Sequence, residues 1–132
     1  MGPVNWLAVA LAALVGLALA LLWLGPLSRS RRGAMLGAQR PALPVLAPLV
    51  VMALAAIMFG HAFARIGSDT LAIKPWLYFM QTGGIAIAFV MPALWMMQGR
   101  QGTEPARKLG DCLFWLLAYL SMGVVFWLVP QV

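Results

Sequence analysis

Long apolar runs separated by short charged stretches dominate the chain. The runs without a charged residue are Val4–Leu27, Ala42–Ala64, Pro75–Gly99 and Cys112–Val132. Each is about 20 residues long or slightly longer, the length that an α-helix needs to cross a hydrocarbon layer of about 30 Å. The pattern predicts an all-α fold, an integral membrane four-helix bundle with short connections, in which residues 1–132 form a single domain.

Helix breakers refine the boundaries of the four spans. We expect the spans at approximately 5–26, 45–65, 76–98 and 110–129. Pro92 removes one helical hydrogen bond and clashes with the preceding turn, so the third span should kink near its middle or its inner half. Asp111 is expected to cap the start of the fourth helix, where a carboxylate complements the helix dipole.

Composition strengthens the membrane interpretation. Hydrophobic residues make up 64% of the chain and charged residues 9%, whereas soluble domains have roughly 25% charged residues. A net charge of +6 would indicate nucleic acid in a soluble protein. Here the cations flank apolar spans, so membrane lipids with anionic headgroups are the expected partners, and nucleic acid is not.

The cations are distributed unequally between the connections. Arg29, Arg31, Arg32 and Arg40 follow the first span, and Arg100, Arg107 and Lys108 follow the third, whereas the second connection has only Arg65 and Lys74. The positive-inside rule predicts that the first and third connections are cytoplasmic and that the termini both lie outside. The four arginines of the first connection are the expected lipid or partner contact. Residues 28–40 fit either a loop or a short basic helix on the membrane surface.

Small residues recur at helical spacing within the first three spans. Such ladders let helix backbones approach closely in lipid, where dispersion contact replaces the hydrophobic drive. We therefore expect them at packing interfaces between helices of the bundle. The predicted packing residues are Ala8, Ala12, Gly16, Ala20, Ala56, Gly60, Gly84 and Pro92.

Few residues inside the spans can carry chemistry. His61 could ligate a haem iron or the magnesium of a chlorophyll-type pigment, or accept a proton, although a lone histidine is more commonly a packing or interfacial residue. Tyr78, Gln81 and Thr82 form a polar patch that could join helices by hydrogen bonds or line a shallow cavity. The sequence has no metal-ligand cluster, phosphate loop or nucleophile triad. We predict that the protein is not an enzyme and needs no cofactor, with haem or pigment at His61 as the exception to test.

Both ends of the chain resemble a known family. The start V-N-W-L-A-V from Val4 and the run L-W-L-G-P-L from Leu22 are similar to a small bacterial membrane family catalogued only as a domain of unknown function, whose members commonly begin V-N-W-L and end helix one with W-Y-G-P. The run W-L-L-A from Trp115, followed by Met122-Gly123 and Trp127, resembles the family's ending. The resemblance implies four spans and implies no catalytic role.

These observations lead to one functional hypothesis and two alternatives. The leading hypothesis is a non-catalytic accessory or assembly subunit of a larger membrane complex, which would bind other membrane subunits or copies of itself. The first alternative is a small oligomeric transporter or channel formed around the polar patch or around the kink at Pro92. The second is a haem- or pigment-binding subunit that uses His61.

Overall fold

A computed structural model describes residues 3–24 and 45–129. The described residues form helices without strands, in the chain order α1 (Trp6–Leu24), α3 (Leu46–Ile66), α4 (Ser68–Ile73), α5 (Trp76–Ile85), the π-helical segment η2 (Ala86–Val90), α6 (Met91–Arg100) and α7 (Pro105–Leu128). Four helical stretches are long and apolar enough to cross a membrane, namely α1, α3, the stretch α5–η2–α6, and α7. The chain is an all-α, multi-pass membrane protein.

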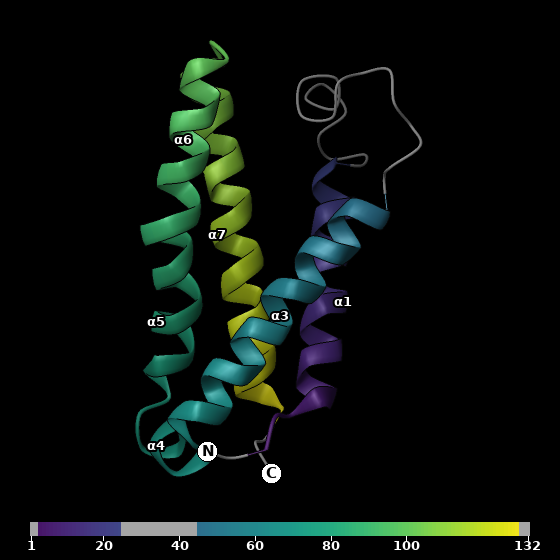
Figure 1. The fold of residues 1–132 in the computed structure, drawn as a ribbon, viewed down its shortest axis with the longest axis vertical. Coiled ribbons are helices and arrows are strands. Elements are labelled where there is room, and N and C mark those ends of the chain that lie inside the picture. The colour runs from purple at the N-terminus through teal and green to yellow at the C-terminus, as the bar shows by residue number, and fades with distance from the viewer. Residues whose placement is uncertain (1–2, 25–44, 130–132) are drawn as a thin grey trace.

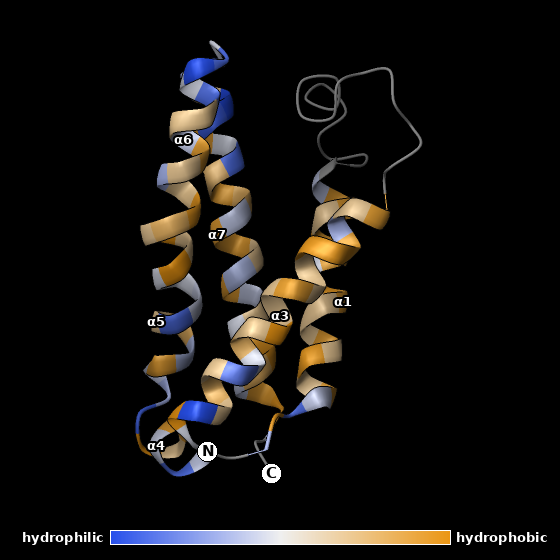
Figure 2. Cartoon of the chain, viewed as in Figure 1, coloured by the Kyte–Doolittle hydropathy of each residue, from blue (hydrophilic) through white to orange (hydrophobic). Residues whose placement is uncertain are grey.

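The helix α7 is the centre of the bundle. It packs against α1 on one side and against α5, η2 and α6 on the other, whereas α3 packs mainly against α1. In Figure 1, α3 runs obliquely across the molecule, and the start of α1 and the end of α7 lie at the same end as α4. Apolar residues extend along the helices, and polar residues concentrate at α4 and at the opposite end, where α6 meets α7 (Figure 2). This distribution matches helices whose middles lie in hydrocarbon and whose ends meet water.

Aromatic rings fill the core near α4. Phe63 is fully buried, and its ring lies 4.9 Å from Tyr78 and 5.0 Å from Phe126, measured between centroids. These three rings come from α3, α5 and α7, so they join both sides of the bundle. Offset and tilted aromatic pairs of this kind add about 0.5–1.5 kcal/mol each beyond the area that they bury. The core therefore depends on this cluster as the place where three helices meet.

The third span changes its helical register at η2. Met91 donates its backbone N–H to the carbonyl of Ala86, five residues earlier. Pro92 explains the irregularity, because it has no N–H to donate and its ring would clash with a carbonyl one turn earlier. In Figure 1, α5, η2 and α6 nevertheless follow one another as one column of turns. The expected kink takes the form of a π-helical insertion just before Pro92.

Two features at the helix ends differ from the sequence prediction. The fourth helix begins at Pro105 rather than near residue 110, so Asp111 lies inside α7 and does not cap it. Proline suits the first turn of a helix, where its missing N–H has no partner to lose. The short helix α4 in the second connection was not anticipated. It forms because Leu71, which is 1% exposed, packs into the core while Asp69 and Thr70 stay exposed.

Candidate functional site

Small residues of α1 and α3 lie in tight contact with their neighbours. Ala8, Ala12, Gly16 and Ala20 are all buried on α1, and Ala56 and Gly60 are buried on α3. A Cβ added to Gly16 would lie 3.2 Å from the Cβ of Met52 on α3 and would also press on Met122 of α7. A Cβ on Gly60 would collide with Val9 of α1. Glycine at these two positions lets α1, α3 and α7 approach one another.

The small residues of the third span do not lie at a contact between helices. The prediction that Gly84 and Pro92 are packing residues is therefore corrected. A Cβ on Gly84 would meet nothing within 4 Å, and Ala88 and Pro92 are exposed. The third span packs on α7 with a different face, which carries Tyr78, Thr82 and Ala86. Its small-residue face points away from the bundle.

The insertion at η2 determines which residues of α6 face α7. Buried positions Tyr78, Thr82 and Ala86 are four residues apart, and the next inward positions are Met91 and then Leu94 and Gln98. The step of five residues between Ala86 and Met91 matches the extra residue of the π-helical turn. No residue of α6 is fully buried. Among the described residues, α6 packs mainly against η2 and α7, and most of its surface is uncovered.

The polar patch is divided between different environments. Thr82 is buried between α5 and α7 and donates its hydroxyl to the carbonyl of Tyr78, with 2.9 Å between Oγ1 and O. The ring of Tyr78 belongs to the aromatic core, and Gln81 is half-buried. Gly123 of α7 faces the patch, since a Cβ there would lie 2.6 Å from Oγ1 of Thr82. Tyr78 and Thr82 thus serve the contact between α5 and α7.

His61 lies exposed near the C-terminal end of α3. Its Nδ1 is 2.9 Å from the carbonyl oxygen of Ile57, and because a carbonyl only accepts, Nδ1 must carry the proton. The ring stands edge-on to Trp6, with centroids 5.8 Å apart and an interplanar angle of 81°. This arrangement fixes the tautomer and leaves the lone pair of Nε2 available as a ligand. Among the described residues, no group of three or more His, Cys, Asp or Glu side chains could hold a metal ion, so His61 offers a single ligand.

A polar connection between α6 and α7 was missed by sequence reasoning. Gln98 donates its side-chain amide to the carboxylate of Asp111, and the ammonium of Lys108 lies 4.7 Å from the ring centroid of Trp95. The carbonyl of Met91 lies 3.9 Å from the thiol of Cys112. Only the contact register between α6 and α7 brings these residues together. The one indication in the sequence was the polar side chain of Gln98 near the end of the apolar run Pro75–Gly99.

The arginines predicted to contact lipid or a partner lie outside the described residues. These are Arg29, Arg31, Arg32 and Arg40, together with the choice between loop and surface helix for residues 28–40.

Comparison of the sequence with known protein families identifies the family of this chain. Residues 7–127 match the family described as "Protein of unknown function (DUF1761)". The chain belongs to this family. The match covers all four spans and agrees with the resemblance noted at both ends of the sequence. No curated protein and no solved structure matched the chain.

Proposed function

We propose that this member of the DUF1761 family is a non-catalytic accessory or assembly subunit that docks a transmembrane helix of a larger complex. The observation that carries the proposal is the outward-facing ladder of Gly84, Ala88 and Pro92, which no described helix of the chain covers. Small residues at four-residue spacing allow another helix to approach closely, and in lipid such dispersion contact is a main source of helix association. The proposal that the protein is non-catalytic rests on the sequence, in which no Asp or Glu lies in the middle of a span.

The proposed setting is the inner membrane of a bacterium, with both termini outside the cytoplasm. The support is the distribution of basic residues. Arg100, Arg107 and Lys108 lie where α6 meets α7, and Arg65 and Lys74 flank α4 at the other end. In the sequence, four further arginines fall between α1 and α3. Cytoplasmic connections carry an excess of Lys and Arg, so this side should be cytoplasmic.

Purification in mild detergent tests the docking proposal. The wild-type chain should elute with a second membrane protein, or a second copy, in fixed stoichiometry. Gly84→Leu combined with Ala88→Leu should abolish that association, because the new side chains occupy the docking face. These changes should leave the bundle intact, since a Cβ on Gly84 meets nothing within 4 Å.

A matched control comes from α1, where Ala10 and Ala18 are also exposed. Ala10→Leu with Ala18→Leu adds a similar apolar volume, smaller by one methylene group, to a different helix and should leave the association unchanged. An isolated wild-type monomer, or equal association in both double variants, would contradict the proposal.

One observation favours a second function at His61. The hydrogen bond from its Nδ1 to the Ile57 carbonyl orients the ring and presents Nε2 outward, as in histidines that ligate metals. We propose as an alternative that His61 would supply one nitrogen ligand to the metal of a haem or pigment, with a further ligand from a partner. The transporter alternative has no such support, because the Thr82 hydroxyl is already engaged within its own helix.

A further inference from the structure

The π-helical turn η2 and the proline after it withdraw hydrogen-bond donors from the middle of the third span. In a regular α-helix each N–H donates to the carbonyl four residues earlier. Met91 donates instead to the carbonyl of Ala86, five residues earlier, so Ile87 loses its regular donor. Pro92 has no N–H, so Ala88 loses its regular donor as well. Two successive carbonyls therefore lose their partners within one turn.

The rest of the described chain does not replace both donors. The carbonyl of Val90, which is the N-cap of α6, accepts the first hydrogen bond of that helix. The one backbone N–H left for the carbonyls of Ile87, Ala88 and Phe89 is then that of Ala93. None of the described side chains donates a hydrogen bond to these three carbonyls. Two of the three are thus left without a donor in the described structure.

The unpaired carbonyls lie near the middle of the span and on its uncovered side. The turn η2 (Ala86–Val90) falls centrally in the candidate span Trp76–Arg100. Ile87 is 58% exposed, Phe89 is 71% exposed and Ala88 is exposed too, so the described helices do not cover this side. Hydrocarbon offers no water to an unpaired backbone group, which is therefore costly at this depth.

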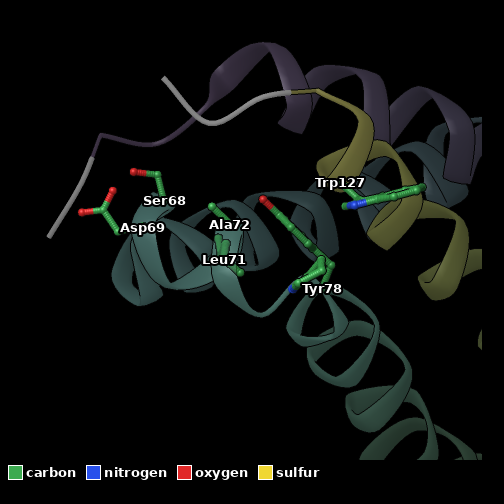
Figure 3. A pocket seen from close by; sticks show the side chains of 7 residues that line it. Ser68, Asp69, Leu71, Ala72, Tyr78 and Trp127 are labelled. Atoms are coloured by element: carbon green, nitrogen blue, oxygen red, sulfur yellow. The ribbon is translucent and has the colours of Figure 1, made fainter.

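Polar groups at the end of the molecule are in a different situation. An open hollow of about 480 Å³ adjoins α4, and Figure 3 shows Ser68 and Asp69 pointing away from Tyr78 and Trp127. Ser68 and Asp69 are exposed at an end of the bundle where polar residues concentrate (Figure 2). Water can pair such groups, because the ends of membrane helices reach the interface. The carbonyls of η2 need a donor from another source.

We propose that the helix docked on Gly84, Ala88 and Pro92 carries a hydrogen-bond donor at the depth of η2 and donates it to the unpaired carbonyls. The donor is a polar side chain such as serine, threonine, asparagine or glutamine. This inference rests on the docking face proposed above and adds the chemistry of the partner. Small residues on that face let the partner's backbone approach closely enough for a short side chain to reach a carbonyl. Neighbouring helices satisfy backbone groups freed by proline in this way in other membrane proteins.

A second copy of this chain does not supply such a donor through the same face. In a parallel pair of copies the third spans would meet at Gly84, Ala88 and Pro92, whose side chains have no N–H or O–H. The nearest polar side chain before this face, Thr82, is buried and already donates its hydroxyl to Tyr78. The occupant is therefore a helix of another protein.

Two synthetic transmembrane peptides test the proposed hydrogen bond. Both are leucine-rich helices with a ladder of alanine and glycine at four-residue spacing, and they differ only at the central residue, which is serine in one and alanine in the other. Energy transfer between the labelled peptide and the labelled full chain in phosphatidylcholine vesicles measures binding. The serine peptide should bind about threefold to tenfold more tightly, the range expected for one interhelical hydrogen bond in a membrane.

Two variants supply the missing donors within the chain. Pro92→Ala restores an N–H, whereas Ala93→Ser keeps the proline and adds a hydroxyl that can bond to a carbonyl one turn earlier. Each should abolish the preference for the serine peptide. Pro105→Ala is the matched control and should keep the preference, since a proline in the first turn of α7 withholds no helical hydrogen bond. Circular dichroism should show wild-type helicity in all three variants.

The outcomes separate the donor from the docking face itself. Equal binding of the two peptides that is lost in Gly84→Leu/Ala88→Leu refutes the donor and retains the docking face, whereas binding of neither peptide overturns both. A serine preference that survives in Pro92→Ala and in Ala93→Ser also refutes the donor, because the hydroxyl then bonds elsewhere. Energy transfer between labelled copies of the chain that excludes the serine peptide would show that a second copy occupies the face, against the proposal.

Discussion

Replacing Gly123 by alanine should separate α5 from α7. The added Cβ would lie 2.6 Å from Oγ1 of Thr82 and 3.2 Å from the carbonyl oxygen of Tyr78. Oγ1 can retreat only by giving up its 2.9 Å hydrogen bond to that carbonyl, and the backbone carbonyl cannot move without shifting α5. Overpacking of this kind costs about 1–3 kcal/mol. Alanine returns about 1 kcal/mol through its better helix propensity. We expect Gly123→Ala to lower the free energy of unfolding by up to about 2 kcal/mol.

Two companion variants isolate the clash. Thr82→Ala removes Oγ1 and Cγ2, so the double variant Thr82→Ala/Gly123→Ala should recover most of the loss, with a coupling energy of about 1–2 kcal/mol. Gly84→Ala is the matched control on the opposite face of α5. Since its Cβ meets nothing within 4 Å, it should be neutral or stabilise by up to about 1 kcal/mol.

Equilibrium unfolding in mixed dodecyl maltoside and dodecyl sulfate micelles, followed by circular dichroism, measures these differences. The reasoning is refuted if Gly123→Ala unfolds at the same detergent fraction as Gly84→Ala. It is also refuted if Thr82→Ala fails to relieve Gly123→Ala, because the close contact with Thr82 would then not be the cause.

Three further predictions concern the hydrogen bond between α6 and α7, ligation of haem by His61, and the orientation of the chain in the membrane. Asp111→Ala removes the acceptor of the Gln98 amide and should cost about 0.6–1.7 kcal/mol in the same unfolding assay, as for other interhelical hydrogen bonds in membranes. It should cost nothing further in a Gln98→Leu background. If His61 ligates haem, the purified complex should show a visible absorption band that His61→Ala removes; an unchanged band excludes His61 as ligand. The orientation can be tested in a variant that lacks Cys112. A membrane-impermeant maleimide should label Ala72→Cys in intact cells and Gln101→Cys only after permeabilisation. The reverse pattern would show that the topology is inverted.

The sequence predicted the spans well for a simple physical reason. Charged side chains are costly in hydrocarbon, so a helix that crosses the membrane leaves a long uncharged run in the sequence. The four runs correspond to the four long helical stretches of the structure. Within the second connection, however, α4 was not foreseen, because a helix as short as Ser68–Ile73 is held by the tertiary contact of Leu71 rather than by its own propensity.

Which face of each helix packs inward was less predictable. Gly16 and Gly84 belong to similar small-residue ladders, yet Gly16 lies in a three-helix contact and Gly84 meets open space. In soluble proteins polarity distinguishes the buried face, but both faces of a transmembrane helix are apolar, so the pattern alone does not identify the inner one. The insertion at η2 adds a further shift in register.

The sequence by itself determined that the chain is helical, that it has four membrane spans and that the connections between them carry unequal charge. These properties follow from the cost of moving charge and unpaired backbone out of water. Only the tertiary structure decided that Gly84 faces outward, that Gln98 meets Asp111 and that Phe63, Tyr78 and Phe126 meet in one aromatic cluster. These arrangements depend on how helices distant in sequence pack, and that packing depends on shape complementarity between faces of nearly equal hydropathy.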